Sequence, residues 1–325
     1  DSPESADSPG SASSPTPVGS PAPAPSAERS AYRVAPDLSV LTQRPRQLHR
    51  DISTRPGQPA SRRWAALLAT LLRGDEEATR RAAVLARVQA PVTTGRRIIV
   101  TGAHGGAGAT TVALALTDVL HAHRADGVLL LDAAGHAGGL MARLTQAPTM
   151  SVAAADRHLR DDHPEAVLHP HARPIRAVLA PAHAEPAVAV DVARRLQRRV
   201  GFSVVDTDAR NLDAFTPDAD AMVLVAENTV RGLVCVSAAV QQRAAAGLAM
   251  QRIIVVVLER VADSGLRAGR ALAEVHRLHP VRVVVLPRDR HLAGGAHLRS
   301  ELLAPATTTA LMQLAGEVVS GGEPS

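Results

Sequence analysis

The chain contains no lysine, so arginine supplies all 36 of its basic residues. It has a single cysteine, Cys235, which excludes an internal disulfide and fits a reducing cytoplasm. Aromatic residues make up 1% of the sequence, so an apolar core must be built from valine, leucine, isoleucine and alanine. No apolar run is long enough to span a bilayer, and the first residues lack the basic and apolar regions of a signal peptide. These absences predict a cytoplasmic protein with no transmembrane segment.

The excess of positive charge has two interpretations. A net charge of +5 favours binding to polyanions or to an anionic membrane surface. An arginine-rich codon usage produces the same charge with no partner at all. The run RRLQRR at 194–199 would form a basic helix face, but no helix-turn-helix pattern or interleaved aromatic residues support it. Non-specific DNA binding is therefore allowed by the sequence but not supported by it.

Composition divides the chain into four segments. Residues 1–60 are rich in proline, serine and alanine and are predicted to be disordered, as is a short tail at 320–325. Residues 61–94 form a helical lead-in, and 95–319 form the main domain. The first lead-in helix has an apolar face at 64–72 that could lie on a membrane, although docking on its own domain is favoured. A second helix, at about 75–88, opens with three acidic residues, as the helix dipole prefers.

The main domain alternates short apolar runs with amphipathic segments. Strands are predicted at 97–102, 127–132, 175–180, 202–208, 221–227, 252–258 and 281–287. Helices are predicted between most of them, at 110–124, 186–199, 230–246 and 264–278. Continuously apolar strands that alternate with helices indicate an α/β fold with a mostly parallel sheet, covered by helices on both faces.

A glycine-rich segment, TGAHGGAGATT at 101–111, lies between the first predicted strand and a predicted helix. In that position glycines let backbone N–H groups converge on an anion, and the helix N-terminus adds positive potential. Two threonines stand where phosphate loops place the hydroxyl that binds Mg²⁺. The sequence therefore predicts a nucleotide-binding loop made by Gly105, Gly106, Gly108, Thr110 and Thr111.

The segment HGGAGATT resembles the deviant Walker A loop of the MinD/ParA ATPase family, whose pattern is KGGxGKTT. GVLLLDAAGHAGGL resembles the family's second strand and the loop after it, and FSVVDTDAR resembles its Walker B strand. RIIVVVLER and VVVLPRDRHL resemble the late strands that hold the base. The match covers 95–318, and the segment before it is similar to actinobacterial MinD-like proteins with Pro-rich N-terminal tails, some associated with type VII secretion. The resemblance implies a P-loop NTPase fold and a site for ATP and Mg²⁺, with Thr110 and Asp206 at the metal.

Four positions depart from the family pattern. His104 replaces the signature lysine, Ala109 replaces the P-loop lysine, Ala134 replaces the catalytic aspartate, and Glu259 replaces an asparagine that contacts adenine. A protonated His104 could contact a phosphate, or the histidine could reflect drift at a site no longer under catalytic demand. No lysine elsewhere can supply the missing ammonium groups, and the sequence does not locate an arginine that would replace them.

These losses predict a pseudo-ATPase with no catalytic residue that the sequence can name. ATP binding and hydrolysis would be weakened or absent, with ATP and Mg²⁺ as possible but weakened ligands. The protein would act as a regulatory or scaffolding partner of other proteins, in secretion or spatial positioning. The alternative is an active ATPase that uses an unconventional cation, for partitioning or for positioning a septum or secretion site. A DNA-coating partition protein is a third candidate. The resemblance also allows a homodimer.

The tail prediction can be tested by truncation. A chain that starts at Ser61 should keep the thermal stability of the full chain, because the removed segment has no apolar periodicity and should contribute no core contacts. Thermal unfolding of the two proteins provides the comparison. A melting temperature many degrees lower in the shortened chain would show that the tail belongs to the folded domain.

Overall fold

The structure is a computed structural model of the protein. It describes residues 75–134, 139–140, 143–144, 149–168, 176–179, 186–260, 273, 275–277, 279–295 and 297–321. The predicted tail at 1–60 and the first lead-in helix lie outside these residues, as does most of the helix predicted at 264–278. The domain boundaries therefore remain expectations.

The described strands form one eight-stranded sheet in which every neighbouring pair is parallel. The strands are β1 (Arg96–Gly102), β2 (Val128–Asp132), β3 (Thr149–Ser151), β4 (Arg176–Leu179), β5 (Phe202–Thr207), β6 (Ala221–Glu227), β7 (Ile253–Leu258) and β8 (Arg282–Leu286). Their order is β3-β4-β2-β5-β1-β6-β7-β8. The seven predicted strands are confirmed, and the short edge strand β3 is an addition to them.

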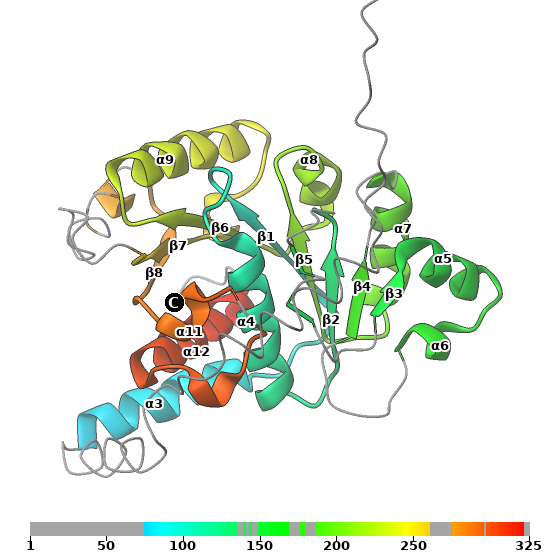
Figure 1. Ribbon diagram of the computed structural model, residues 1–325, viewed down its shortest axis with the longest axis horizontal. Helices are drawn as coiled ribbons and strands as arrows, with labels where there is room; N and C mark the ends of the chain where they lie inside the picture. Colours follow the sequence, from blue (N-terminus) through cyan, green and yellow to red (C-terminus); the bar gives the residue numbers. More distant parts are fainter. Residues whose placement is uncertain are drawn as a thin grey trace, which may run out of the picture.

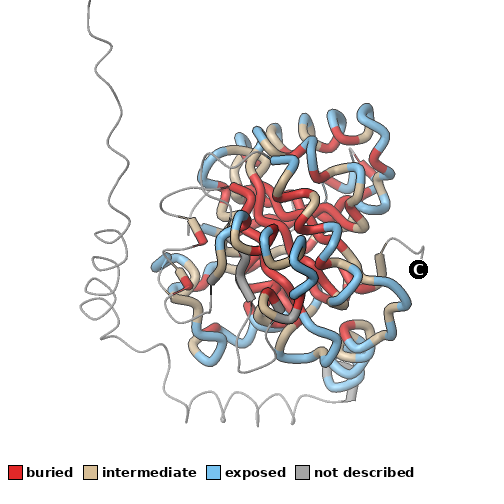
Figure 2. The backbone as a smooth tube through the Cα atoms, turned by 90° about the vertical axis from the view of Figure 1, so that its right-hand side faces the viewer, coloured by how far each residue is buried: buried red, intermediate tan, exposed pale blue. Residues whose placement is uncertain are grey.

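Helices cover both faces of this sheet (Figure 1). They are α3 (Asp75–Val88), α4 (Ala109–His123), α5 (Val152–Arg160), α6 (Pro164–Leu168), α7 (Pro186–Gln197), α8 (Leu212–Phe215), α9 (Val230–Ala245), α11 (Arg290–Ala293) and α12 (Pro305–Ser320). One core cluster joins the sheet to α3, α4 and α12, and a second joins it to α5, α7, α8 and α9. Along β1, Ile98 and Val100 belong to the first cluster and Ile99 to the second. Because both faces are covered, the central strands are buried along their whole length (Figure 2).

The predicted lead-in helix at 75–88 is confirmed as α3, and it packs on α12. Val88 at its end is fully buried. Arg87 forms an ion pair with Glu317 at 3.0 Å and donates to the hydroxyl of Ser320. This second lead-in helix therefore docks on its own domain. None of the helices in the described part of the chain is long and apolar enough to cross a membrane.

The topology brings several loops together at one edge of the sheet. β1 lies between β5 and β6, and the chain leaves β1 toward β2 on one side but later reaches β6 on the other. In open parallel sheets, such a reversal leaves a crevice at the carboxyl ends of the strands, where ligands bind. The loops that follow β1, β2, β5, β7 and β8 all contribute to a cavity at this edge.

Candidate functional site

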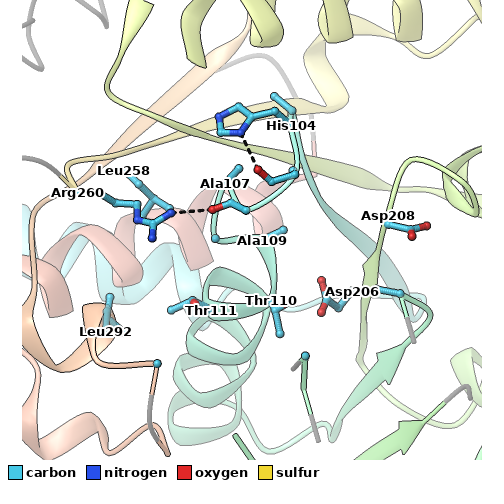
Figure 3. Close-up of a pocket in the computed structure, with 18 of the residues that line it drawn as sticks. His104, Ala107, Ala109, Thr110, Thr111, Asp206, Asp208, Leu258, Arg260 and Leu292 are labelled. Atoms are coloured by element: carbon cyan, nitrogen blue, oxygen red, sulfur yellow. Dashed lines mark hydrogen bonds between the residues drawn. The ribbon is translucent and has the colours of Figure 1, made fainter. Parts of the chain in front are cut away.

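The cavity at the carboxyl ends of the strands has a volume of about 570 Å³. All the residues predicted from the glycine loop line it, together with Asp206. Figure 3 shows Thr110, Thr111 and Asp206 in this cavity. The volume lies within the range of roughly 300–1,000 Å³ that is usual for small-molecule sites. The structure thus brings the predicted loop and the predicted metal residue to one place.

The loop between β1 and α4 depends on two left-handed glycines. Gly106 has a φ of 78° and Gly108, the N-cap residue of α4, has a φ of 99°. The first backbone bond of the helix runs from the N–H of Val112 to the carbonyl of Gly108, at 3.1 Å. The N–H groups of Ala109, Thr110 and Thr111 precede that bond and have no partner within the helix. These donors, at the positive end of a helix of 15 residues, form a site for an anion.

Asp206 lies beside this helix terminus. It is near the end of β5, in register with Val100 of β1 and Asp132 of β2, and only 1% of its surface is exposed. The Thr110 hydroxyl donates to the carboxylate, while Oδ2 is buried with no partner. Burial raises the pKa of Asp206 to about 7, and the Thr110 hydrogen bond only partly opposes that shift. An orphaned carboxylate oxygen next to a hydroxyl is a donor set that fits Mg²⁺.

The positions where the family pattern has lysine or aspartate carry other groups. His104 is partly buried, and its Nδ1 donates to the carbonyl of Gly105 at 3.1 Å. Its Nε2 has no partner. Ala109 begins α4, and Ala134 is buried with its N–H donating to Asp132 Oδ1 at 3.1 Å. Neither alanine can supply a cation or orient a water molecule.

Four arginines of the described part of the chain line the cavity, and two of them, which the sequence did not single out, contact the glycine loop or the first turn of α4. Arg143, from the loop after β2, donates from Nη1 to the Thr111 hydroxyl. Arg260, just after β7, donates from Nη1 to the carbonyl of Gly106 and to Glu227 Oε1, both at 2.7 Å. Arg143 is 32 residues from Thr111 and Arg260 is 154 residues from Gly106, so spacing along the chain could not reveal either contact. The one available signal was the absence of lysine, which leaves arginine as the permanent cation.

Two other features of the sequence bear on possible sites, its metal-ligand residue types and the basic run at 194–199. Within the described residues, no group of three histidine, cysteine or acidic side chains could hold a metal ion. In the basic run at the end of α7, Arg194 pairs with Asp218 at 2.6 Å and Arg195 pairs with Asp191 at 2.8 Å. Part of the charge that would attract DNA is therefore neutralised within the domain.

The pKa of Asp206 predicts a pH dependence of stability. A raised pKa means that the folded chain holds a proton from about pH 4 to pH 7 that the unfolded chain has released. This carboxyl therefore lowers the free energy of unfolding as the pH rises through that window, and no further above about pH 7. In Mg²⁺-free buffer, Asp206→Asn should melt at a higher temperature than the wild type at pH 8 and at nearly the same temperature at pH 4.

Asp191→Asn, on the exposed part of α7, controls for the loss of one negative charge. If the melting temperatures of Asp206→Asn and the wild type differ by the same amount at pH 4 and at pH 8, the account of a buried, protonated carboxyl is contradicted.

No profile of a known protein family matches the sequence, and no curated protein matches it. Solved structures do match. A ParA family ATPase from Chlorobium tepidum is 17% identical, with a TM-score of 0.53 and coverage of 68% of this chain and 98% of that protein. MinD in a MinC:MinD cell division complex from Aquifex aeolicus is 16% identical, with a TM-score of 0.55 and coverage of 71% and 98%. A McdA variant from Cyanothece in complex with ATP is 19% identical, with a TM-score of 0.50 and coverage of 72% and 99%.

At these identities the likeness shows the fold. The match takes in nearly the whole length of each solved chain and leaves out part of this one. The parallel sheet, its covering helices and the glycine loop before α4 agree with that assignment. The chain has the fold of the ParA/MinD family ATPases.

Proposed function

We propose that this chain is a ParA/MinD-like protein in which ATP binding is weakened and hydrolysis is weakened or lost, and which acts as a regulatory or scaffolding partner of other proteins. One observation carries the proposal. The loop keeps the backbone geometry for an anion, while positions 104, 109 and 134 hold a histidine and two alanines. The site retains its shape but has lost charged groups at those three positions.

The retained residues fit a nucleotide with its metal. The N–H groups of the first turn of α4 would bind phosphate oxygens, and the Thr110 hydroxyl and the orphaned Asp206 oxygen would hold Mg²⁺, directly or through water. When bound, Mg²⁺ neutralises phosphate charge and orients the phosphate chain. The base would lie toward the loops after β7 and β8, where Leu258, Glu259 and Leu292 line the cavity.

Hydrolysis would lack two groups that stabilise charge or position water in the family pattern. Ala109 offers no ammonium to the phosphates, and Ala134 offers no carboxylate to a water molecule. The nearby carboxylate of Asp132 accepts from the N–H of Ala134, which ties one of its oxygens to the backbone. Phosphoryl transfer depends on positioning and charge stabilisation, and the loss of one such group costs roughly 2.7–4 kcal/mol of barrier.

An active ATPase is the second candidate, and the arginines favour it. Arg143 and Arg260 bring positive charge to the loop from other parts of the chain. They could restore some of the electrostatic stabilisation that the lysines provide in the family pattern. They cannot replace the missing carboxylate at Ala134, so we place this candidate second.

Protein partners belong to the proposal as well. One of the similar structures is MinD in complex with MinC, so a domain of this fold can bind another protein. For this chain we propose a protein partner of unknown identity, a role in secretion or positioning, and the capacity to form a homodimer. DNA binding through the end of α7 receives little support, since Arg194 and Arg195 are engaged in ion pairs.

The proposal predicts that Mg²⁺-dependent ATP turnover by the purified chain is at or near background. The physical reason is that position 109 offers no ammonium group to the phosphates and position 134 offers no carboxylate to a water molecule. Phosphate release should be compared between the wild type, Thr110→Ala and Asp206→Ala. A clear turnover in the wild type that disappears in both variants would replace this proposal with the active ATPase.

Restoring the missing lysine tests the assignment of the loop. Ala109→Lys should raise ATP affinity about 10- to 150-fold, equivalent to about 1.5–3 kcal/mol for hydrogen bonds to a charged group. Turnover should stay at background because Ala134 is unchanged. Calorimetric titration at fixed Mg²⁺ and salt measures the affinity.

Ala293→Lys is the matched control. Ala293 lines the same cavity from α11 and is exposed, so a lysine there adds the same charge without disturbing the core. An equal gain from both variants would indicate a general charge effect and would remove the support for the loop assignment.

A further inference from the structure

The backbone around Arg143 is held from two directions. The N–H of Arg143 donates to the carbonyl of Leu140 at 3.0 Å, and Leu140 is fully buried in the core cluster that contains α4. On the other side, Nδ1 of His297 donates to the carbonyl of Arg143 at 2.9 Å. The backbone of Arg143 is thus bonded both to Leu140 in the core and to His297 in the segment after α11.

The side chain of Arg143 reaches the helix terminus where the anion site lies. Its Nη1 donates to the hydroxyl of Thr111, in the first turn of α4. Asp206, whose oxygen lacks a partner, is close enough to interact with it electrostatically. The guanidinium has five N–H donors in a rigid fork, and Thr111 accepts from one of them. The guanidinium therefore lies against the first turn of α4, whose leading N–H groups have no partner within the helix.

Burial distinguishes Arg143 from the other arginines of the cavity. Arg143 is partly buried, and this desolvation, opposed by Asp206 but reinforced by the positive charge of Arg260, lowers its pKa. Arg260 has a side chain 52% exposed that pairs with Glu227, and Arg210 has one 65% exposed that pairs with Asp208 at 2.6 Å. A desolvated guanidinium without a bidentate carboxylate partner gains most from a bound anion.

We propose that Arg143 is the phosphate-binding cation of this site, supplied from the loop after β2 in place of the lysine that the glycine loop lacks. This inference rests on the proposed function, because it requires that the cavity binds a phosphate chain. Arg143 and the first turn of α4 would hold the same phosphate group from two sides. The ligand class is a nucleoside triphosphate or another linear polyphosphate.

A guanidinium and an ammonium bind phosphate differently, so exchanging one for the other should change the affinity of the site. Arginine binds phosphate oxygens through two parallel N–H bonds, whereas lysine acts as a point charge on a flexible chain. Arg143→Lys should therefore keep only part of the affinity. Because an ammonium at position 109 would reach the same phosphate from the loop side, Ala109→Lys should compensate for the loss of Arg143.

The test is a titration of the full chain with Mg²⁺·ATP and, separately, with inorganic tripolyphosphate. Arg143→Ala should weaken both ligands by about 10- to 100-fold, since the lost contact is a charge-assisted hydrogen bond to phosphate. The double variant Arg143→Ala, Ala109→Lys should recover most of that loss. Arg210→Ala, which removes an equal charge from the same cavity, should stay within about threefold of the wild type, because its guanidinium is already paired.

The possible failures are distinguishable. If the wild type binds neither ligand, the proposed function falls and the role of Arg143 falls with it. If the wild type binds both and Arg143→Ala binds equally well, the proposed function stands and the role of Arg143 is overturned. A loss for ATP but not for tripolyphosphate would also overturn it, because the contact would then be to the nucleoside. Thermal melting without ligand checks folding, and Arg143→Gln, which keeps much of the side-chain volume, replaces the alanine variant if that one unfolds.

Discussion

At Gly108 the backbone turns from the glycine loop into α4 with a φ of 99°, and the cavity depends on that turn. The left-handed conformation directs the N–H groups of the next residues into the space at the end of the sheet, while α4 itself packs into the core. A side chain at this position would be strained by its φ, and its Cβ would lie 2.7 Å from Cδ1 of Leu258. The same turn places Thr110 against Asp206 and Thr111 against Arg143. The positions of the loop, of the proposed metal ligands and of the Arg143 guanidinium therefore all depend on the turn at Gly108.

Charge is distributed around this turn in an unusual way. In the family pattern the loop carries its own lysines, so the cations and the backbone donors belong to one segment. Here the loop carries backbone donors and a histidine, and the arginines that contact the loop and the first turn of α4 come from the loops after β2 and β7. Such an arrangement can still attract phosphate, because the guanidinium and the helix terminus act in the same small volume. Ala134 still lacks the group that would orient a water molecule. In the proposed function, binding and hydrolysis therefore depend on different residues, and binding can persist without hydrolysis.

The sequence predicted those features that depend on local pattern. Strand β7 is a continuous apolar run of isoleucine, valine and leucine, β1 has a shorter run of isoleucine and valine at its centre, and the glycine loop has its own spacing. By contrast, β3 is three residues long and pairs at the sheet edge, so no apolar run indicated it. Arg97 has no exposed surface although it follows another arginine, because Asp218 and Gln197 from distant segments accept its hydrogen bonds. Arg143 belongs to the same class, since its place beside Thr111 is a product of tertiary structure. The arginines whose contacts join distant segments of the chain could not be predicted from local sequence patterns.

The central claim is that the cavity binds ATP without hydrolysing it efficiently. The most direct measurement is equilibrium dialysis of the wild-type chain against Mg²⁺ and ATP labelled in both base and γ-phosphate, followed by identification of the bound nucleotide. The account predicts that nucleotide is retained in the protein compartment, that it is recovered as intact ATP, and that Gly108→Val abolishes retention. Recovery of ADP with released phosphate at a rate well above background would contradict the account, as would the absence of any retained nucleotide.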